Sequence, residues 1–203
     1  MKVLVRPPEI LRSFYKDAVW RMDKTEPAIY LTFDDGPIPE LTPWVLDVLK
    51  SYQVKATFFC VGDNIHKNPE VFHRILKEGH QVGNHTYNHL KGWKTKEEDY
   101  IYNVEKCQAL TKTNLFRPPY GRIKKKQFKH LSTNYKVIFW DVLSYDYDSL
   151  VSEKTCLKNS IKYTRPGSII VFHDNMKAQK NLQYALPKYI EHFLKLNYKF
   201  SLL

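Results

Sequence analysis

From residue 28 onward, short apolar segments alternate with longer amphipathic segments. Regular alternation of strands and helices produces parallel sheets, because a crossover helix returns the chain to the start of a neighbouring strand. The chain is therefore expected to form an α/β fold with a parallel sheet, either open or closed into a barrel. Seven segments are predicted as strands: residues 28–33, 56–61, 81–84, 114–117, 137–140, 168–172 and 198–202.

The amphipathic segments show helical spacing of their apolar residues. In residues 69–77, one face is marked by Val71, Phe72, Ile75 and Leu76, and Gly79 provides a typical stop signal. Six such helices are expected: residues 39–52, 69–77, 94–112, 124–131, 151–163 and 181–195.

The first 27 residues lack a clear period and contain three prolines, with a short helix expected near residues 9–16. We interpret residues 1–27 as an N-terminal extension and residues 28–203 as a single domain. A chain of 203 residues without a flexible linker agrees with one domain.

Composition excludes several classes of protein. The chain is 43% hydrophobic and 14% aromatic, which is too apolar for a disordered protein. No window approaches eighteen consecutive apolar residues, and basic residues interrupt the N-terminal segment where a signal peptide would need an apolar core. We expect no transmembrane segment and no signal peptide, with a cytoplasmic or envelope-associated location. Three cysteines without C-x-x-C spacing are expected to be buried apolar residues.

The net charge of +11 is compatible with nucleic acid, anionic lipid or acidic glycan as a partner. Residues 124–126 form a short basic run, which is typical of a solvated surface. The sequence has no recognition helix, RNA-binding strand motif or zinc-finger spacing, so no nucleic-acid partner is expected.

Polar residues follow the predicted strands. Asp34 and Asp35 end the first strand, and adjacent carboxylates persist together mainly when a cation neutralises one of them. His85 and His89 follow the third strand at a spacing that lets both imidazoles face one point. Two histidines and one carboxylate suit catalytic zinc with an open position, and the same set also suits non-haem iron.

Three further clusters follow later strands. The segment from Arg117 to Gly121 contains two prolines that fix the loop and leave the Tyr120 backbone N–H available to an oxyanion. Residues 140–147 follow the fifth strand, and His173 closes the sixth with the profile of a general acid or base. Because the active site of parallel α/β folds lies at the carboxyl ends of the strands, all five clusters are expected at one site.

The strings T-F-D-D-G at 32–36, H-T-x-x-H at 85–89 and R-P-P-Y-G at 117–121 resemble the ordered motifs of the NodB-like polysaccharide deacetylases, carbohydrate esterase family four. The resemblance covers about residues 28 to 203. It implies a distorted (β/α)7-type barrel and a divalent metal bound by Asp35, His85 and His89. Zinc is the first expectation, with cobalt, manganese and nickel as alternatives.

The same resemblance implies the catalytic roles. Asp34 would be the base, Arg117 would hold it in place, and the Tyr120 backbone N–H would stabilise the oxyanion. His173 would be the general acid, with its charge supported by Asp146.

The sequence departs from the family pattern around the expected acyl-binding wall. Leu143 and Tyr147 stand where many members have Asp and Trp, and Val171 stands where Leu is usual. The substrate is expected to contact Tyr120, Tyr147 and Val171. Trp93 is a further aromatic residue beside the expected site that is able to stack on sugar rings.

The resemblance implies a monomeric enzyme that removes N-acetyl groups from an N-acetylglucosamine-containing glycan. Peptidoglycan, a chitin-like oligomer and a surface polysaccharide all remain open. Two alternatives are a metal amidase acting on a small non-sugar amide and a glycan-binding domain that lacks turnover.

Overall fold

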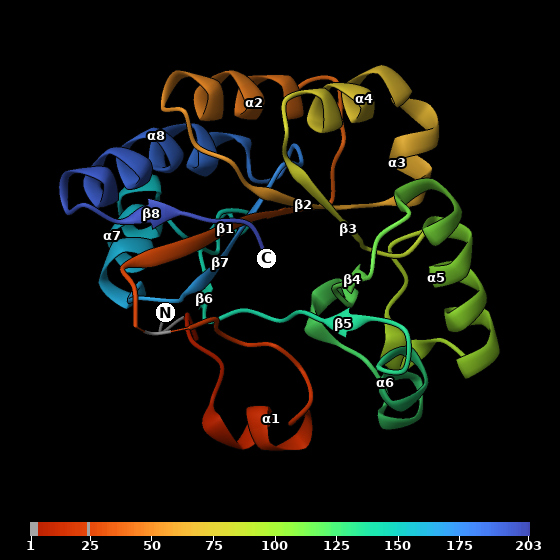
Figure 1. Cartoon of the computed structure of the whole chain (residues 1–203). Coiled ribbons are helices and arrows are strands. Elements are labelled where there is room, and N and C mark those ends of the chain that lie inside the picture. The colour runs from red at the N-terminus through yellow and green to blue at the C-terminus, as the bar shows by residue number, and fades with distance from the viewer. Residues whose placement is uncertain (1–3, 24) are drawn as a thin grey trace.

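The computed structural model describes residues 4–23 and 25–203. The described strands lie in one curled sheet in the order β5-β4-β3-β2-β1-β7-β6, with β8 paired to β1 (Figure 1). All strand pairs of this sheet are parallel. The strands are β1 (Ala28–Asp34), β2 (Thr57–Cys60), β3 (Gln81–Asn84), β4 (Leu115–Phe116), β5 (Lys136–Val137), β6 (Val142–Leu143), β7 (Ile169–His173) and β8 (Lys199–Phe200). The predicted distorted barrel is confirmed.

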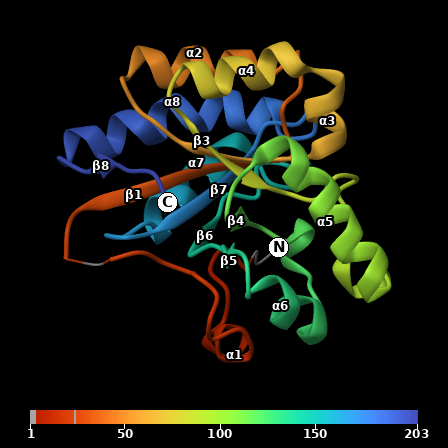
Figure 2. The same ribbon diagram turned by 45° about the vertical axis from the view of Figure 1, so that its right-hand side comes forward.

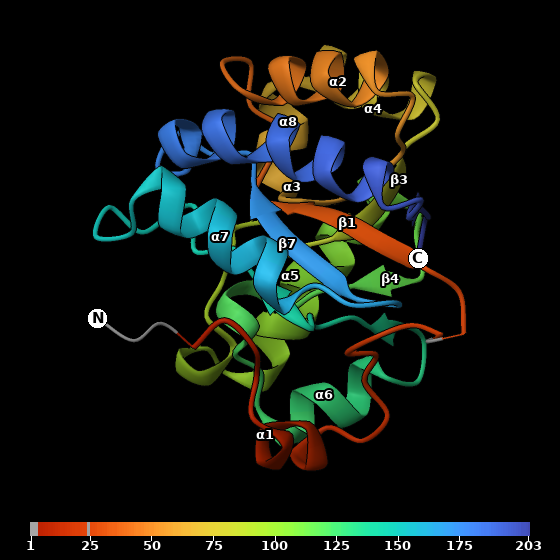
Figure 3. The same ribbon diagram turned by 90° about the vertical axis from the view of Figure 1, so that its left-hand side faces the viewer.

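Helices cover the outer face of the sheet. Figures 1 and 2 show α2 and α4 above β2 and β3, and Figure 3 shows α7 and α8 side by side along β7. The helices are α1 (Glu9–Phe14), α2 (Thr42–Ser51), α3 (Gly62–Lys67), α4 (Pro69–Lys77), α5 (Glu97–Thr111), α6 (Lys125–Leu131), α7 (Glu153–Tyr163) and α8 (Gln179–Lys195), with short 3-10 turns η1 (Gly92–Lys94) and η2 (Pro119–Gly121). In the described residues, no helix has the length and apolar character needed to cross a bilayer.

The differences from the sequence-based expectation concern short elements. The strand β6 and the helix α3 were not predicted, because a two-residue strand and a six-residue helix are too short to show a period. The strand predicted at 137–140 is limited to Lys136–Val137. The three cysteines are free and buried, as predicted.

Strand β1 divides its side chains between two environments. Ile29, Leu31 and Phe33 pack in the main core beneath the helices, with the Phe33 ring stacked on Phe58 at 5.0 Å between centroids. The alternate residue Thr32 faces the interior of the barrel. Because successive side chains of a strand point to opposite faces, this register also places Asp34 on the interior side.

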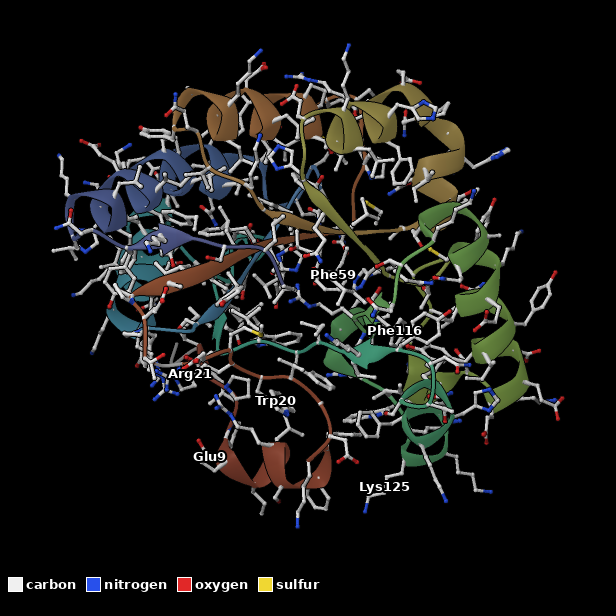
Figure 4. All side chains as sticks on the ribbon, viewed as in Figure 1. Glu9, Trp20, Arg21, Phe59, Phe116 and Lys125 are labelled. Atoms are coloured by element: carbon white, nitrogen blue, oxygen red, sulfur yellow. The ribbon has the colours of Figure 1, made fainter. Side chains whose placement is uncertain are left out.

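The N-terminal segment fills the gap between β5 and β6, which do not pair with each other. Val19 bridges to Ile138, and the Leu143 N–H donates to the Val5 carbonyl at 2.8 Å. The Trp20 ring stacks on Phe139 at 4.2 Å between centroids, and Figure 4 shows Trp20 between α1 and the barrel. The described part of residues 1–27 therefore completes the wall of the barrel, while the boundary at residue 27 stays a prediction.

A buried carboxylate fixes this segment to the amino end of the sheet. Asp141 is fully buried and accepts hydrogen bonds from Arg12 at 2.8 Å, from Arg165 at 2.9 and 3.0 Å, and from Ser168 at 2.8 Å. Burial alone would raise its pKa, but these donors outweigh burial and lower the pKa to about 2.

We predict that Asp141→Asn lowers the free energy of unfolding by about 3 kcal/mol, because it leaves three partly buried guanidinium groups without their shared, fully buried counter-charge. The folded pKa lies below the ordinary value of 3.8, so this stabilisation is present at neutral pH and is lost as the pH falls through about 2. Urea denaturation at pH 7 measures the loss. The control Asp47→Asn, whose side chain also faces an arginine but is 68% exposed, is expected to change stability by less than about 1 kcal/mol.

Candidate metal centre and active site

The five predicted polar clusters meet at the carboxyl ends of the strands. They line one cavity of about 820 Å³, together with residues of the following loops. Pairing of adjacent strands brings these residues close together, since Asp34 on β1 lies in register with His173 on β7. The site residues in this cavity are Asp34, Asp35, His85, His89, Tyr120, Leu143, Tyr147, Val171 and His173.

Asp35, His85 and His89 form the candidate metal centre. Asp35 Oδ1 lies 3.0 Å from His89 Nε2 and 3.6 Å from His85 Nε2, and one ligand atom from each residue lies within 4.8 Å of the others. A tetrahedral ion with bonds of about 2.0–2.1 Å places its ligand atoms roughly 3.3 Å apart. The donor set and its spacing therefore fit a divalent cation with an open coordination position.

The orientation of the His85 ring is set by the barrel wall. Its Nδ1 lies 2.8 Å from the Arg117 carbonyl oxygen, so Nδ1 carries the proton and Nε2 presents a lone pair to the cluster. Burial opposes ionisation of Asp35, but the neighbouring His85 and His89 imidazoles outweigh burial and hold the pKa of Asp35 well below its usual value.

The histidine loop is a tight turn, not a helix. Thr86 and His89 have positive φ values of 63° and 55°. The Asn103 side-chain carbonyl accepts hydrogen bonds from the Tyr87 and Asn88 N–H groups, each at 2.9 Å. These contacts from α5 keep the loop in a conformation that brings both imidazoles to one point.

Asp34 is held by a buried arginine. Arg117 is fully buried and donates through Nη1 to Asp34 Oδ1 at 2.6 Å and to Thr32 Oγ1 at 2.8 Å. Its remaining donors reach the Ile138 and Phe139 carbonyls at 3.3 and 3.1 Å. Asp34 Oδ2 remains on the metal side, 4.0 Å from His85 Nε2.

His173 is paired with a buried carboxylate. Its Nδ1 lies 2.8 Å from Asp146 Oδ1, and its backbone N–H donates to Asp146 Oδ2 at 2.7 Å. Burial lowers the pKa of His173, but the charge and hydrogen bond of Asp146 outweigh burial and raise it to about 9. The arrangement leaves Nε2 as the free donor of a protonated imidazole.

The predicted substrate contacts lie around this centre. The Tyr147 ring meets the His173 ring edge-on at 4.8 Å, and Val171 and Leu143 form an apolar patch of the wall. Tyr120 has φ 60° and ψ 7°, and its ring is half-exposed, 4.6 Å from the His89 ring.

Two supporting residues were missed from the sequence. Asn175 donates to Asp35 Oδ2, and the buried Asp174 accepts from the Gly36 N–H at 3.0 Å and from Thr42 Oγ1 at 2.6 Å. Gly36 has no room for a side chain, since a Cβ would lie 2.0 Å from Asp174 Oδ2. The signal in the sequence was the polar pair Asp174 and Asn175 directly after His173, to which no role was assigned.

An Asp-His-His cluster with room for a cation, beside a carboxylate held by arginine and a histidine paired with aspartate, is an arrangement suited to metal-assisted hydrolysis. Residues 21–136 match the sequence profile described as polysaccharide deacetylase. The chain belongs to the polysaccharide deacetylase family.

Individual relatives agree with this assignment. The peptidoglycan-N-acetylglucosamine deacetylase of Bacillus cereus is 40% identical over 152 residues, which are 71% of this chain and 55% of the relative. The peptidoglycan-N-acetylmuramic acid deacetylase PdaA of Bacillus subtilis is 35% identical over 179 residues, 80% of this chain and 67% of the relative. This chain thus spans about half the length of the first relative and two thirds of the second.

A solved structure supports the fold over nearly the whole chain. The crystal structure of a peptidoglycan N-acetylglucosamine deacetylase in complex with 4-naphthalen-1-yl-N-oxidanyl-benzamide has a TM-score of 0.89 and 33% identity. The match covers 97% of this chain and 95% of that chain.

We predict that Zn²⁺ raises the thermal midpoint of this protein, because an ion that binds only the folded state stabilises it by about 2.7 kcal/mol at a hundredfold excess over Kd. His85→Ala is expected to remove the shift. The control His130→Ala changes an exposed histidine on α6 and is expected to keep it. An equal zinc-dependent shift in the wild type and His85→Ala would contradict the assignment of the centre.

Proposed function

We propose that this chain is a metal-dependent deacetylase that removes N-acetyl groups from a glycan containing N-acetylglucosamine or N-acetylmuramic acid. One observation supports this proposal above the others. The three candidate metal ligands line the same cavity as Asp34, which Arg117 holds, and His173, which is paired with Asp146. The named activities of the peptidoglycan relatives support peptidoglycan as the first candidate substrate.

The proposed reaction is hydrolysis of the acetamide C–N bond. A divalent cation held by Asp35, His85 and His89 supplies Lewis acidity, which lowers the pKa of water toward 7. Asp34 accepts the proton of the attacking water, and the hydrogen bond from Arg117 Nη1 keeps the Asp34 carboxylate correctly oriented.

Charge then develops on the carbonyl oxygen and on the leaving nitrogen. The Tyr120 backbone N–H donates to the oxyanion, a contribution of about 2.7–4 kcal/mol when one such donor is preorganised. His173 donates its proton to the amine nitrogen as the C–N bond breaks, so the products are acetate and a free amino sugar.

The shape of the site favours a glycan over a small amide. A cavity of about 820 Å³ is far larger than an acetamide group requires. Its apolar patch of Leu143 and Val171 is suited to the acyl methyl group, with Tyr147 beside it. A binding domain without turnover is disfavoured, because the base, the acid and all three candidate ligands are present.

The two adjacent aspartates are predicted to behave differently. Asp34→Asn should bind metal like the wild type and lose about 10²–10⁴-fold in kcat, since only proton transfer is removed. Asp35→Asn should weaken metal binding itself. Acetate release from N-acetylglucosamine oligomers and from peptidoglycan, with metal content measured in parallel, tests both.

The control Asp99→Asn changes an exposed carboxylate in the first turn of α5 and should retain metal and turnover. Chelation should abolish acetate release by the wild type, and added metal should restore it. Acetate release that survives complete metal removal would sink the proposed function.

We predict that kcat/KM declines as the pH rises toward about 9, because His173 then loses the proton that it must donate. A bound cation opposes protonation, so the decline begins at or below this value. Asp146→Asn removes the charge that supports the imidazolium, and the alkaline decline should move to lower pH by at least about one unit. An unchanged alkaline limb in this variant would contradict the role of His173.

A further inference from the structure

Three basic side chains line the cavity without a carboxylate partner. Lys91, Arg122 and Lys177 are exposed along its rim. Within residues 4–23 and 25–203, none of the three forms an ion pair with Asp or Glu. Unpaired cations beside a catalytic cavity attract anionic groups of a ligand.

The carboxylates of the same cavity are already neutralised. Asp34 is paired with the buried Arg117, and Asp35 belongs to the metal centre. Asp63 lies 2.5 Å from Lys67 Nζ. The rim therefore carries a positive charge that no acidic side chain of the cavity cancels.

Two of the cations lie on aromatic rings, and one of these rings is next to the candidate metal centre. Lys91 Nζ is 4.6 Å from the centroid of the Tyr120 ring, and that ring is 4.6 Å from the His89 ring. The Arg122 guanidinium lies 5.1 Å from the Trp93 ring, which is 55% exposed. Sugar rings stack on such aromatic faces, and the neighbouring cations remain available to charged substituents.

The loops that carry these cations are fixed to each other. The Trp93 indole N–H donates to the Ile123 carbonyl at 3.1 Å, and the Gln127 amide donates to the Gly92 carbonyl at 3.1 Å. Gly92 packs so closely that a Cβ there would lie 2.6 Å from the Arg122 carbonyl oxygen. The two cations are thus presented from preorganised backbone, which reduces the entropy cost of binding.

We propose that Lys91 and Arg122 form a subsite for carboxylates carried by the glycan beside the reacting N-acetylated sugar. This inference rests on the proposed function. A neutral N-acetylglucosamine polymer offers no charged group to the subsite. A peptidoglycan strand offers carboxylates from two sources: the lactyl group of a muramic acid that carries no peptide, and the peptide itself where one is attached, because the lactyl carboxyl is then an amide. The subsite selects the anionic glycan over the neutral one.

The test compares the zinc-loaded wild type with the double variant Lys91→Gln/Arg122→Gln. Kd by calorimetry and kcat/KM by acetate release are measured on three glycans: an N-acetylglucosamine tetramer, peptide-free peptidoglycan strands with free lactyl carboxylates, and peptide-bearing strands. The double variant should lose about tenfold in affinity for a carboxylate-bearing strand, with the loss in KM, and less than about twofold for the tetramer.

Salt and a matched control identify the charge as the cause. Raising the ionic strength from about 0.05 to 0.3 M should reduce the preference of the wild type for anionic strands and leave the double variant unchanged. Lys188→Gln is the control, because Lys188 Nζ also lies over a tyrosine ring, that of Tyr184 at 3.9 Å, but on α8 outside the cavity. It should bind and turn over all three glycans like the wild type.

The outcomes separate the subsite from the proposed function. A loss confined to peptide-free strands assigns the lactyl carboxylate, and a loss confined to peptide-bearing strands assigns the peptide. Equal losses on all three glycans, or none, would overturn the subsite. Carboxylate-selective binding without acetate release would sustain the subsite and overturn the deacetylase proposal, whereas acetate release without charge selectivity would do the reverse.

Discussion

The buried contact between Arg117 and Asp34 is the interaction on which the site depends. Burial of a guanidinium costs free energy unless its N–H groups have hydrogen-bond acceptors. The fully buried Arg117 donates to Asp34, to Thr32 and to two backbone carbonyls. The guanidinium also lies 4.0 Å from the Phe59 ring. One side chain from the end of β4 thus ties together β1 and the segment after β5. Its own carbonyl orients His85, so the same residue positions the proposed base and a proposed metal ligand.

The barrel wall depends on a second set of contacts, because the two end strands of its sheet do not pair with each other. The strands β5 and β6 are only two residues long and do not pair, and the N-terminal segment occupies the space between them. Asp141 anchors that segment through Arg12 while also binding Arg165 on the loop before β7. The candidate site lies at the carboxyl ends of the strands, whereas the Asp141 cluster at their amino ends holds the segment that closes the barrel wall. Such a separation lets the catalytic loops keep unusual backbone conformations without weakening the wall of the barrel.

Periodicity and order along the chain were enough to predict a parallel sheet, most helices and the convergence of the five polar clusters, whereas the distorted barrel was implied by the family resemblance. Short elements escaped prediction because β6 and α3 contain too few residues to show a repeat. The supporting contacts escaped for a different reason. Asp174 beneath Gly36 and the Arg117 carbonyl on His85 are long-range contacts, and no local pattern encodes which carbonyl or carboxylate will face a given side chain. The role of the N-terminal segment was hidden in the same way, since its partners lie more than a hundred residues away.

The charged residues of the candidate site fall into two groups, one buried in the barrel and one exposed on the rim of the cavity. The deep charges occur in matched pairs, in which Asp34 lies 2.6 Å from Arg117 and Asp146 lies 2.8 Å from His173. The rim charges are unmatched and exposed, so they add little to stability and remain free to interact with a ligand. Buried pairs cannot be altered without loss of the reaction centre, whereas exposed cations can be exchanged with little effect on the fold. Under the proposed function, the deep pairs would therefore determine the reaction type and the rim cations the choice of substrate.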